Sequence, residues 1–155
     1  MAHTTYDQEM FIAASPAVVQ EQLAQLMTNI SGMQPFVVWS RHVQTTTTAD
    51  GESVDHYRVR EHVKLGRFVL PITVKVDMCV TTTGRLVSNA YQSPGIHLYN
   101  HTWCEPEGAG TRVYEHIEIT APRLLLKTTY HGAASAHQEM FARLKERIEQ
   151  APLSV

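Results

Sequence analysis

The sequence predicts an α+β domain in which one strand and one or two short helices precede six further strands and one long C-terminal helix. Residues 36–120 fall into segments of alternating apolar and polar residues, separated by turns that contain Gly or Pro. These strand-like segments follow one another without intervening helices, so short turns join antiparallel neighbours. Residues 122–150 instead show apolar residues at helical spacing, which indicates one amphipathic helix that covers the apolar face of the sheet.

The N-terminal part is expected to form a strand and then a helix. Thr4–Ala13 alternate loosely and lead into the segment SPAVVQEQLAQLM. Ser15 suits an N-cap and Pro16 suits the first helical position. Because apolar residues then follow at helical spacing, we predict a helix over 15–27, with a short second helix or a turn near Asn29–Met33.

The central part is expected to form the remaining strands of a seven-stranded sheet. Their predicted ranges are Phe36–Thr48, Glu52–Leu65, Arg67–Thr82, Arg85–Gln92, Ile96–Cys104 and Thr111–Thr120, with turns at ADGE, Gly66, Gly84, SPG and EPEGAG. One strand carries an apolar residue at every second position, namely Phe68, Leu70, Ile72, Val74, Val76, Met78 and Val80. Since alternate side chains point to one face, we expect that face to be buried.

The final helix is unusual because its middle consists of small residues, the stretch GAASA at 132–136. A spacing of 100° per residue places the following side chains on its apolar face: Leu126, Tyr130, Ala133, His137, Met140, Phe141, Leu144 and Ile148. Small residues on that face allow two interpretations. They let the helix lie close against the sheet, or they leave a cavity between helix and sheet. Gly132 is expected to lie off this face.

His137 is the one readily ionised side chain at the centre of the predicted helix face, so its ring should point toward the sheet. Burial disfavours the charged form of an imidazole, which predicts a neutral His137 at pH 7. Two roles remain open for it. It is either a core histidine with a hydrogen-bond partner, or a wall residue that contacts a ligand.

Two glutamates, Glu61 and Glu115, share the parity of apolar residues on their strands. Such a carboxylate either finds a partner, stays at a wet rim, or has a raised pKa. If Cys104 pairs with Thr111, Asn100 lies opposite Glu115 on the aliphatic face, and Trp103 lies on the outer face with other aromatic residues. A register slip of one residue would turn those aromatics inward, and the first register is favoured.

Composition excludes several classes of function. The chain of 155 residues suits one domain, 1–155, and its net charge of −2 contains no long run of either sign, which argues against a nucleic-acid partner. No signal peptide or membrane span is visible, and Cys79 and Cys104 fit no zinc or redox spacing, so we expect a cytoplasmic protein with reduced thiols. No metal, cofactor or nucleophile motif is present, so we expect neither metal nor cofactor. The oligomeric state is not indicated.

Three segments resemble the START/Bet-v-1-like (SRPBCC) superfamily, whose fold is called the helix grip. FIAASPAVVQEQLAQL resembles its first strand and helix, HTWCEPEGAGTRVYEHIEITAP its last hairpin, and SAHQEMFARLKERIE the end of its C-terminal helix. The resemblance covers nearly the whole chain and implies a curved seven-stranded antiparallel sheet around a long helix, with two short helices after the first strand. It implies one ligand-binding domain with a cavity between sheet and helix.

The superfamily includes lipid carriers, polyketide cyclases and chaperone cofactors, so three functions are open. The favoured one is binding of a small hydrophobic or aromatic molecule, such as a lipid, quinone or polyketide-like compound. The alternatives are a polyketide aromatase/cyclase-type enzyme and a partner-binding module. Catalytic residues are not assigned. The candidate ligand contacts are His137, Ala133, Tyr130, Met140, Glu61, Glu115, Asn100, Leu70, Ile72 and Val74.

Overall fold

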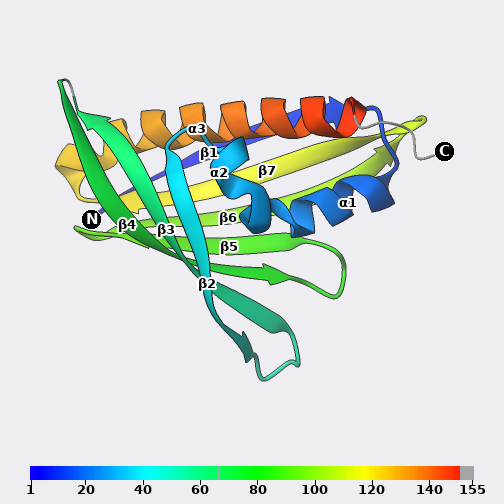
Figure 1. Cartoon of the computed structure of the whole chain (residues 1–155), viewed down its shortest axis with the longest axis horizontal. Coiled ribbons are helices and arrows are strands. Elements are labelled where there is room, and N and C mark those ends of the chain that lie inside the picture. The colour runs from blue at the N-terminus through cyan, green and yellow to red at the C-terminus, as the bar shows by residue number, and fades with distance from the viewer. Residues whose placement is uncertain (66, 151–155) are drawn as a thin grey trace.

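Seven strands, two short helices and one long helix follow one another in the expected order in the computed structural model, which describes residues 1–65 and 67–150 (Figure 1). The strands are β1 (Ala2–Ile12), β2 (Val37–Thr47), β3 (Ser53–Leu65), β4 (Phe68–Val80), β5 (Leu86–Gln92), β6 (Ile96–Glu107) and β7 (Gly110–Ala121). The helices are α1 (Pro16–Ala24), α2 (Ile30–Met33) and α3 (Arg123–Glu149). The turn expected at Gly66 lies outside the described residues.

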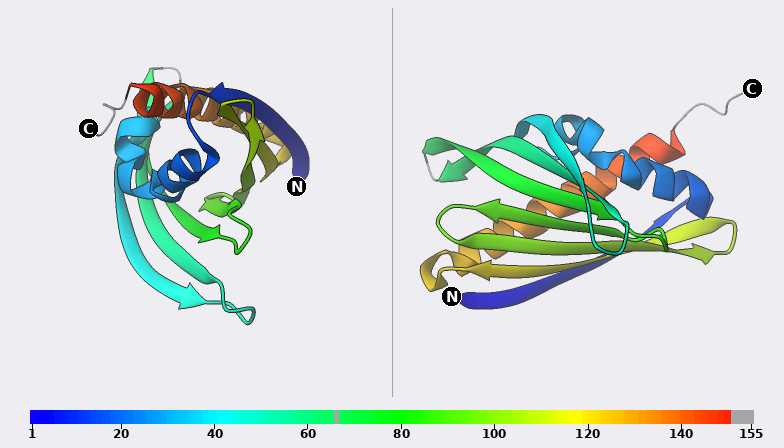
Figure 2. Two further views of the ribbon diagram at one scale, coloured as in Figure 1. Left: turned by 90° about the vertical axis from the view of Figure 1, so that its right-hand side faces the viewer. Right: turned by 90° about the horizontal axis from the view of Figure 1, so that it is seen from below.

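All strands belong to one antiparallel sheet with the order β1-β7-β6-β5-β4-β3-β2. The first strand therefore lies beside the last, and β2 forms the opposite edge. The sheet curves around α3 and the two short helices (Figure 2). This arrangement confirms the predicted α+β helix-grip fold.

Helix α1 is shorter than predicted, and the chain turns sharply after it. The Ser15 hydroxyl accepts a hydrogen bond from the backbone N–H of Val18 at 3.4 Å, as expected of an N-cap. The helix ends at Ala24 instead of residue 27, and a tighter 3₁₀ turn over Leu26–Asn29 leads into α2. Apolar residues of this region pack in one core cluster with the C-terminal half of α3, namely Val19, Leu23, Leu26, Met27, Ile30 and Met33.

The last hairpin differs in register from the prediction. Cys104 pairs with Val113 and not with Thr111, because Glu105–Glu107 continue β6 and the turn needs only two residues. Gly108 takes a φ of 55°, the left-handed backbone that such a turn favours. A shift of two residues leaves every side chain on its predicted face. Asn100 and Glu115 therefore share the inner face, while Trp103 stacks on Tyr114 outside, with ring centroids 5.4 Å apart.

The apolar face of β4 is buried only at its centre, which corrects the expectation of a fully buried face. Val74 and Met78 are buried, but Phe68 is 72% exposed, Leu70 44% and Val80 45%. β4 has 13 residues, and the exposed ones lie mostly toward its two ends. Alternation in sequence identifies a common face, but it does not say how far along the strand the covering helix reaches.

Candidate functional site

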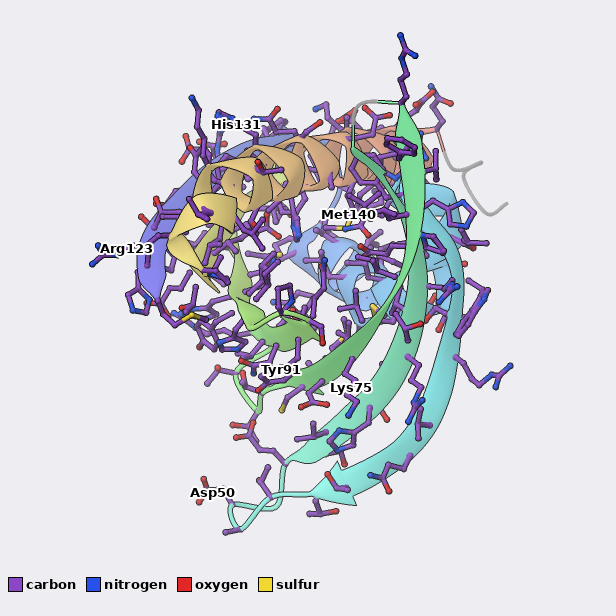
Figure 3. All side chains as sticks on the ribbon, turned by 90° about the vertical axis from the view of Figure 1, so that its left-hand side faces the viewer. Asp50, Lys75, Tyr91, Arg123, His131 and Met140 are labelled. Atoms are coloured by element: carbon purple, nitrogen blue, oxygen red, sulfur yellow. The ribbon has the colours of Figure 1, made fainter. Side chains whose placement is uncertain are left out.

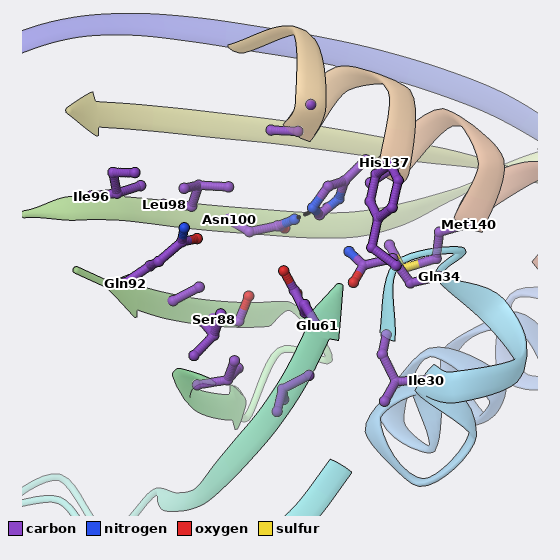
Figure 4. Close-up of a pocket in the computed structure, with 18 of the residues that line it drawn as sticks. Ile30, Gln34, Glu61, Ser88, Gln92, Ile96, Leu98, Asn100, His137 and Met140 are labelled. Carbon is purple, nitrogen blue, oxygen red and sulfur yellow. Dashed lines mark hydrogen bonds between the residues drawn. The ribbon is translucent and has the colours of Figure 1, made fainter. Parts of the chain in front are cut away.

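A cavity of about 460 Å³ lies between the concave face of the sheet and α3. Its sheet wall is mostly aliphatic and comes from the three central strands β4, β5 and β6 together with β3 (Figure 4). The three predicted wall residues of β4, Leu70, Ile72 and Val74, all line it. Further wall residues are Val59, Val76, Met78, Leu86, Ala90, Ile96 and Leu98, and Leu23, Met27 and Ile30 close the cavity on the side of the short helices.

On the helix side, the cavity is lined partly by the predicted face and partly by an adjacent stripe. Ala133, His137, Met140 and Phe141 of the predicted face border it, and so do the neighbouring residues Leu125, Thr128, Thr129, Gly132 and Ala136. Gly132, expected off the face, therefore borders the cavity. The helix lies obliquely between the cavity and strands β1 and β7, so its apolar residues serve two different surroundings.

Tyr130 belongs to the second surrounding and is not among the residues that line the cavity. Its ring meets that of Tyr6 edge to face at a centroid distance of 6.1 Å. It packs in a second core cluster formed by Tyr6, Ile117, Ile119 and Ala134. Tyr130 is thus the one candidate ligand contact that does not border the cavity.

The small residues of 132–136 fulfil both interpretations, and Ala133 takes part in both. Ala134 packs closely against strands β1 and β7 in the second core cluster. Gly132, Ala133 and Ala136 line the cavity, and a Cβ added to Gly132 would meet no atom within 4 Å. Toward the C-terminus, α3 carries bulky buried residues, among them Phe141 and Leu144. The cavity therefore lies where side-chain volume is missing. Met140 lies under α3, inside the curve of the sheet, whereas Arg123 and His131 point outward (Figure 3).

A polar cluster is centred on the carboxylate of Glu115, whose side chain is only 1% exposed. The carboxylate accepts hydrogen bonds from three donors: Gln8 Nε2 at 2.7 Å, Asn100 Nδ2 at 2.6 Å and His137 Nδ1 at 3.0 Å. The Thr102 hydroxyl in turn donates to Asn100 Oδ1 at 2.9 Å. Four elements, β1, β6, β7 and α3, thus hold one buried carboxylate whose oxygens are fully hydrogen-bonded.

Glu115 and His137 each favour the charged form of the other. Burial alone would raise the pKa of Glu115, but the nearby His137 and the three hydrogen bonds outweigh it, and the pKa is lowered. Burial alone would lower the pKa of His137, but the charge and hydrogen bond of Glu115, with a smaller effect of Glu61, raise it. The expectation considered burial alone, which would lower the pKa of His137, whereas the ionised partner reverses the direction of the shift.

Glu61 projects from β3 into the same cavity, toward Asn100 and His137 (Figure 4). Burial raises the pKa of this carboxyl, and the nearby His137 only partly opposes the shift. Among the hydrogen bonds between described side chains, none involves Glu61. The candidates Glu61, Glu115, Asn100, His137, Ala133 and Met140 thus come together around one cavity.

The sequence interpretation did not single out Gln8 and Thr102, although both carried a usable signal. Gln8 lies between Tyr6 and Met10 on the parity that β1 buries, and Thr102 shares the parity of Asn100. A polar residue on an apolar strand face was the signal that pointed to the two glutamates. In β1 apolar and polar residues alternate only loosely, so Gln8 did not stand out as a polar residue on an apolar face.

No family model and no curated protein matches the sequence. Solved structures do match. A protein from Thermus thermophilus shares 20% identity with a TM-score of 0.72, over 96% of this chain and 99% of that one. A START superfamily protein from Mycobacterium smegmatis shares 13% identity with a TM-score of 0.66, over 96% and 99% of the two chains. The Zhui aromatase/cyclase from a Streptomyces species shares 13% identity with a TM-score of 0.67, over 97% and 99%.

These similarities show that the chain has the START-like (SRPBCC) helix-grip fold, which the sequence had predicted. Within residues 1–65 and 67–150, no helix has the length and apolar composition that a membrane span requires. In the same residues, no three His, Cys, Asp or Glu side chains are grouped as ligands of a metal ion.

Proposed function

We propose that this protein binds a small, largely apolar molecule, such as a lipid, a quinone or a polyketide-like compound, in the cavity beneath α3. The observation that carries the proposal is the cavity itself. Its volume of about 460 Å³ falls in the range of small-molecule sites, roughly 300–1,000 Å³. Its walls are aliphatic over most of their area, and its ionisable groups lie together in one region around Glu61, Asn100 and His137.

In this cavity the apolar walls would supply affinity for a ligand, and the polar groups would orient it. Burial of apolar ligand surface contributes about 25 cal/mol per Å² and has no preferred direction. The polar region offers directional contacts, so a ligand with one oxygen or nitrogen function would bind with that end near His137 and its hydrocarbon part near β4.

Native mass spectrometry of the purified protein tests the proposal by looking for a co-purified apolar molecule. A second test measures the binding of an apolar fluorescent dye to Ala133→Leu, which extends a side chain into the cavity. Ser135→Leu is the matched control, because Ser135 is exposed on the solvent side of the same helical turn. We expect Ala133→Leu to weaken dye binding at least several-fold and Ser135→Leu to leave it unchanged.

The two variants also show whether the cavity is real. Unfolding of Ala133→Leu while Ser135→Leu stays folded would mean that Ala133 is in close contact with the sheet, and that the volume at this position is not available. Equal dye binding by both variants would place the binding elsewhere.

A second candidate function, acid–base catalysis on a bound ketone of the polyketide type, is supported by the ionisable groups in the cavity. A carboxylate that holds an imidazole by Nδ1 leaves Nε2 available to take or give a proton, and Glu61 lies across from it. A cavity that folds a flexible chain of ketones would also bring reacting carbons together. The similarity in fold to a protein named as an aromatase/cyclase is consistent with this candidate.

Proton exchange separates the two candidates without knowledge of the natural substrate. An aryl β-diketone in D₂O would lose its exchangeable carbon-bound protons faster with the wild-type protein than with His137→Gln, as followed by NMR. Equal exchange rates for both proteins would remove the catalytic candidate and leave ligand binding. A partner-binding module with a filled core is not supported, since the core contains a cavity.

We also propose that the protein works in the cytoplasm and binds no nucleic acid. Both cysteines are free thiols, and burial raises the pKa of Cys104 to about 11, so that thiol stays protonated. Labelling of both thiols in unfolded protein taken directly from cells would support this location, and a disulfide would contradict it.

A further inference from the structure

The cavity contains an unequal set of charges. Among the described residues that line it, the ionisable ones are Glu61, Glu115 and His137, and none is Lys or Arg. Glu115 and His137 neutralise each other within 3.0 Å. The acidic group that remains for a ligand to meet is therefore Glu61, whose pKa burial raises and whose ionised form a bound donor or cation would favour.

We propose that the cavity is specific for ligands that are not anionic and that place a hydrogen-bond donor, a hydroxyl or a protonated amine, on the carboxylate of Glu61. This inference rests on the ligand-binding function proposed above. It adds the chemical class of the ligand and identifies Glu61 as the specificity-determining residue.

The neighbours of Glu61 in the sheet leave its carboxylate available to a ligand. On β3 it pairs with Ile72 of β4 on one side and with Val37 of β2 on the other. Neither neighbour has a side-chain donor. Arg60, the next residue, faces the opposite side of the sheet and donates to the Thr73 hydroxyl at 2.9 Å. A carboxylate in an aliphatic wall is costly unless a donor reaches it, and a bound hydroxyl or ammonium group supplies one.

The contrast with Glu115 strengthens this argument. Both carboxylates line the cavity, but Glu115 has a donor from each of three surrounding elements, whereas the hydrogen bonds of the described side chains include none to Glu61. Glu115 is therefore part of the framework that positions His137. Glu61 is placed as the group that contacts a ligand.

An anionic ligand would meet unfavourable charges in this cavity. A carboxylate or phosphate near Glu61 would face a like charge. The one nearby cation, His137, already serves Glu115, so the anion would compete with an existing buried ion pair. Free fatty acids and other carboxylate-bearing amphiphiles should consequently bind less well than their alcohols or amines.

Four probes of nearly equal size test the proposal: naphthylmethanol, its methyl ether, naphthylmethylamine and naphthoate. Isothermal titration at pH 7 gives their affinities for the wild-type protein, with methylnaphthalene as the reference for apolar burial alone. We expect the alcohol and the amine to bind at least ten-fold more tightly than naphthoate and several-fold more tightly than the methyl ether, which has no donor.

The variant Glu61→Gln removes the charge and keeps the size and an acceptor oxygen. It should weaken amine binding roughly ten-fold, change alcohol binding less, and strengthen naphthoate binding. Glu118→Gln is the matched control, since Glu118 is exposed on the other side of the sheet, and it should change none of the affinities.

The outcomes distinguish the two proposals. Equal binding of all five compounds, or an unchanged order of affinities in Glu61→Gln, leaves ligand binding in place and overturns the role of Glu61. Naphthoate as the tightest ligand would also overturn it. A wild-type protein that binds neither methylnaphthalene nor any of the four probes contradicts the ligand-binding function, and the specificity falls with it.

Discussion

Replacing Glu115 by Gln changes the least exposed charge of the cavity and preserves its shape. The carboxylate accepts from Gln8 on Oε1 and from Asn100 and His137 on Oε2. A glutamine amide offers an acceptor on one side only, so in either orientation its NH₂ group faces a donor. A turn of the Gln8 amide would restore the bond on its side, but its oxygen would then leave the Tyr6 hydroxyl, which donates to it at 3.4 Å. In either orientation His137 loses the charge of its partner and keeps at most a neutral acceptor, at a cost of about 1–3 kcal/mol.

The cost depends on pH in a way that the two pKa shifts define. His137 has a raised pKa, so its contribution to stability is complete below its ordinary value of about 6.5 and is lost as the pH rises through its value in the folded protein. Glu115 has a lowered pKa, so its contribution is complete above about 4.5 and is lost as the pH falls through its folded value. Wild type and Glu115→Gln should therefore differ most in free energy of unfolding between about pH 4.5 and 6.5.

Urea unfolding from pH 4 to pH 8 gives the difference in free energy, and an NMR titration of His137 gives its pKa in both proteins. We expect His137 to titrate above about 6.5 in the wild type and below that value in Glu115→Gln, where only the smaller effect of Glu61 opposes burial. A difference in stability that does not vary with pH would refute the reasoning, as would a His137 pKa that the substitution leaves in place.

Three further substitutions test the packing around the cavity. Gly132→Ala should stabilise the protein by about 0.5–1 kcal/mol in urea unfolding, because a helical glycine is replaced and the new methyl group meets open space. Gly110→Ala should destabilise it by about 1–3 kcal/mol, since the added Cβ would lie 2.7 Å from the backbone oxygen of Ile12, and an increase in stability would contradict this geometry. His137→Leu should cost about 3–5 kcal/mol because it leaves the buried Glu115 without its counter-charge, and a cost below about 1 kcal/mol would show that the pair is not formed in solution.

The order of elements was predictable because local signals and the fold agree. Ser15 and Pro16 mark the start of α1 in sequence, and the structure places the N-cap bond and the first helical residue there. Turns with Gly or Pro separate the strands, and each neighbouring pair in the central part of the chain is antiparallel. The last hairpin was the exception, since Pro106 suggested a loop where the backbone remains extended.

The composition of the candidate site was partly predictable, and its charges were not. Strand parity places Glu61, Asn100 and Glu115 on the inner face whatever the register, provided that the shift is even. The contact between Glu115 and His137 joins residues that are 22 positions apart, and only the three-dimensional packing of α3 brings them within 3.0 Å. A sequence shows that both are on apolar faces, but it does not show that they share a hydrogen bond, and that bond decides the sign of the pKa shift.

The two surroundings of α3 show a similar limit and also explain where the cavity lies. A single helix that touches two surfaces has two apolar stripes, and a helical wheel drawn from residue types merges them into one broad face. The residues toward β1 and β7 include Tyr130 and Ala134, which fill their space, whereas Gly132 and Ala136 on the adjacent stripe leave theirs open. The cavity thus follows from a difference in side-chain size between two stripes of the same helix, at the level where His137 and Glu61 bring polar groups to an otherwise aliphatic wall.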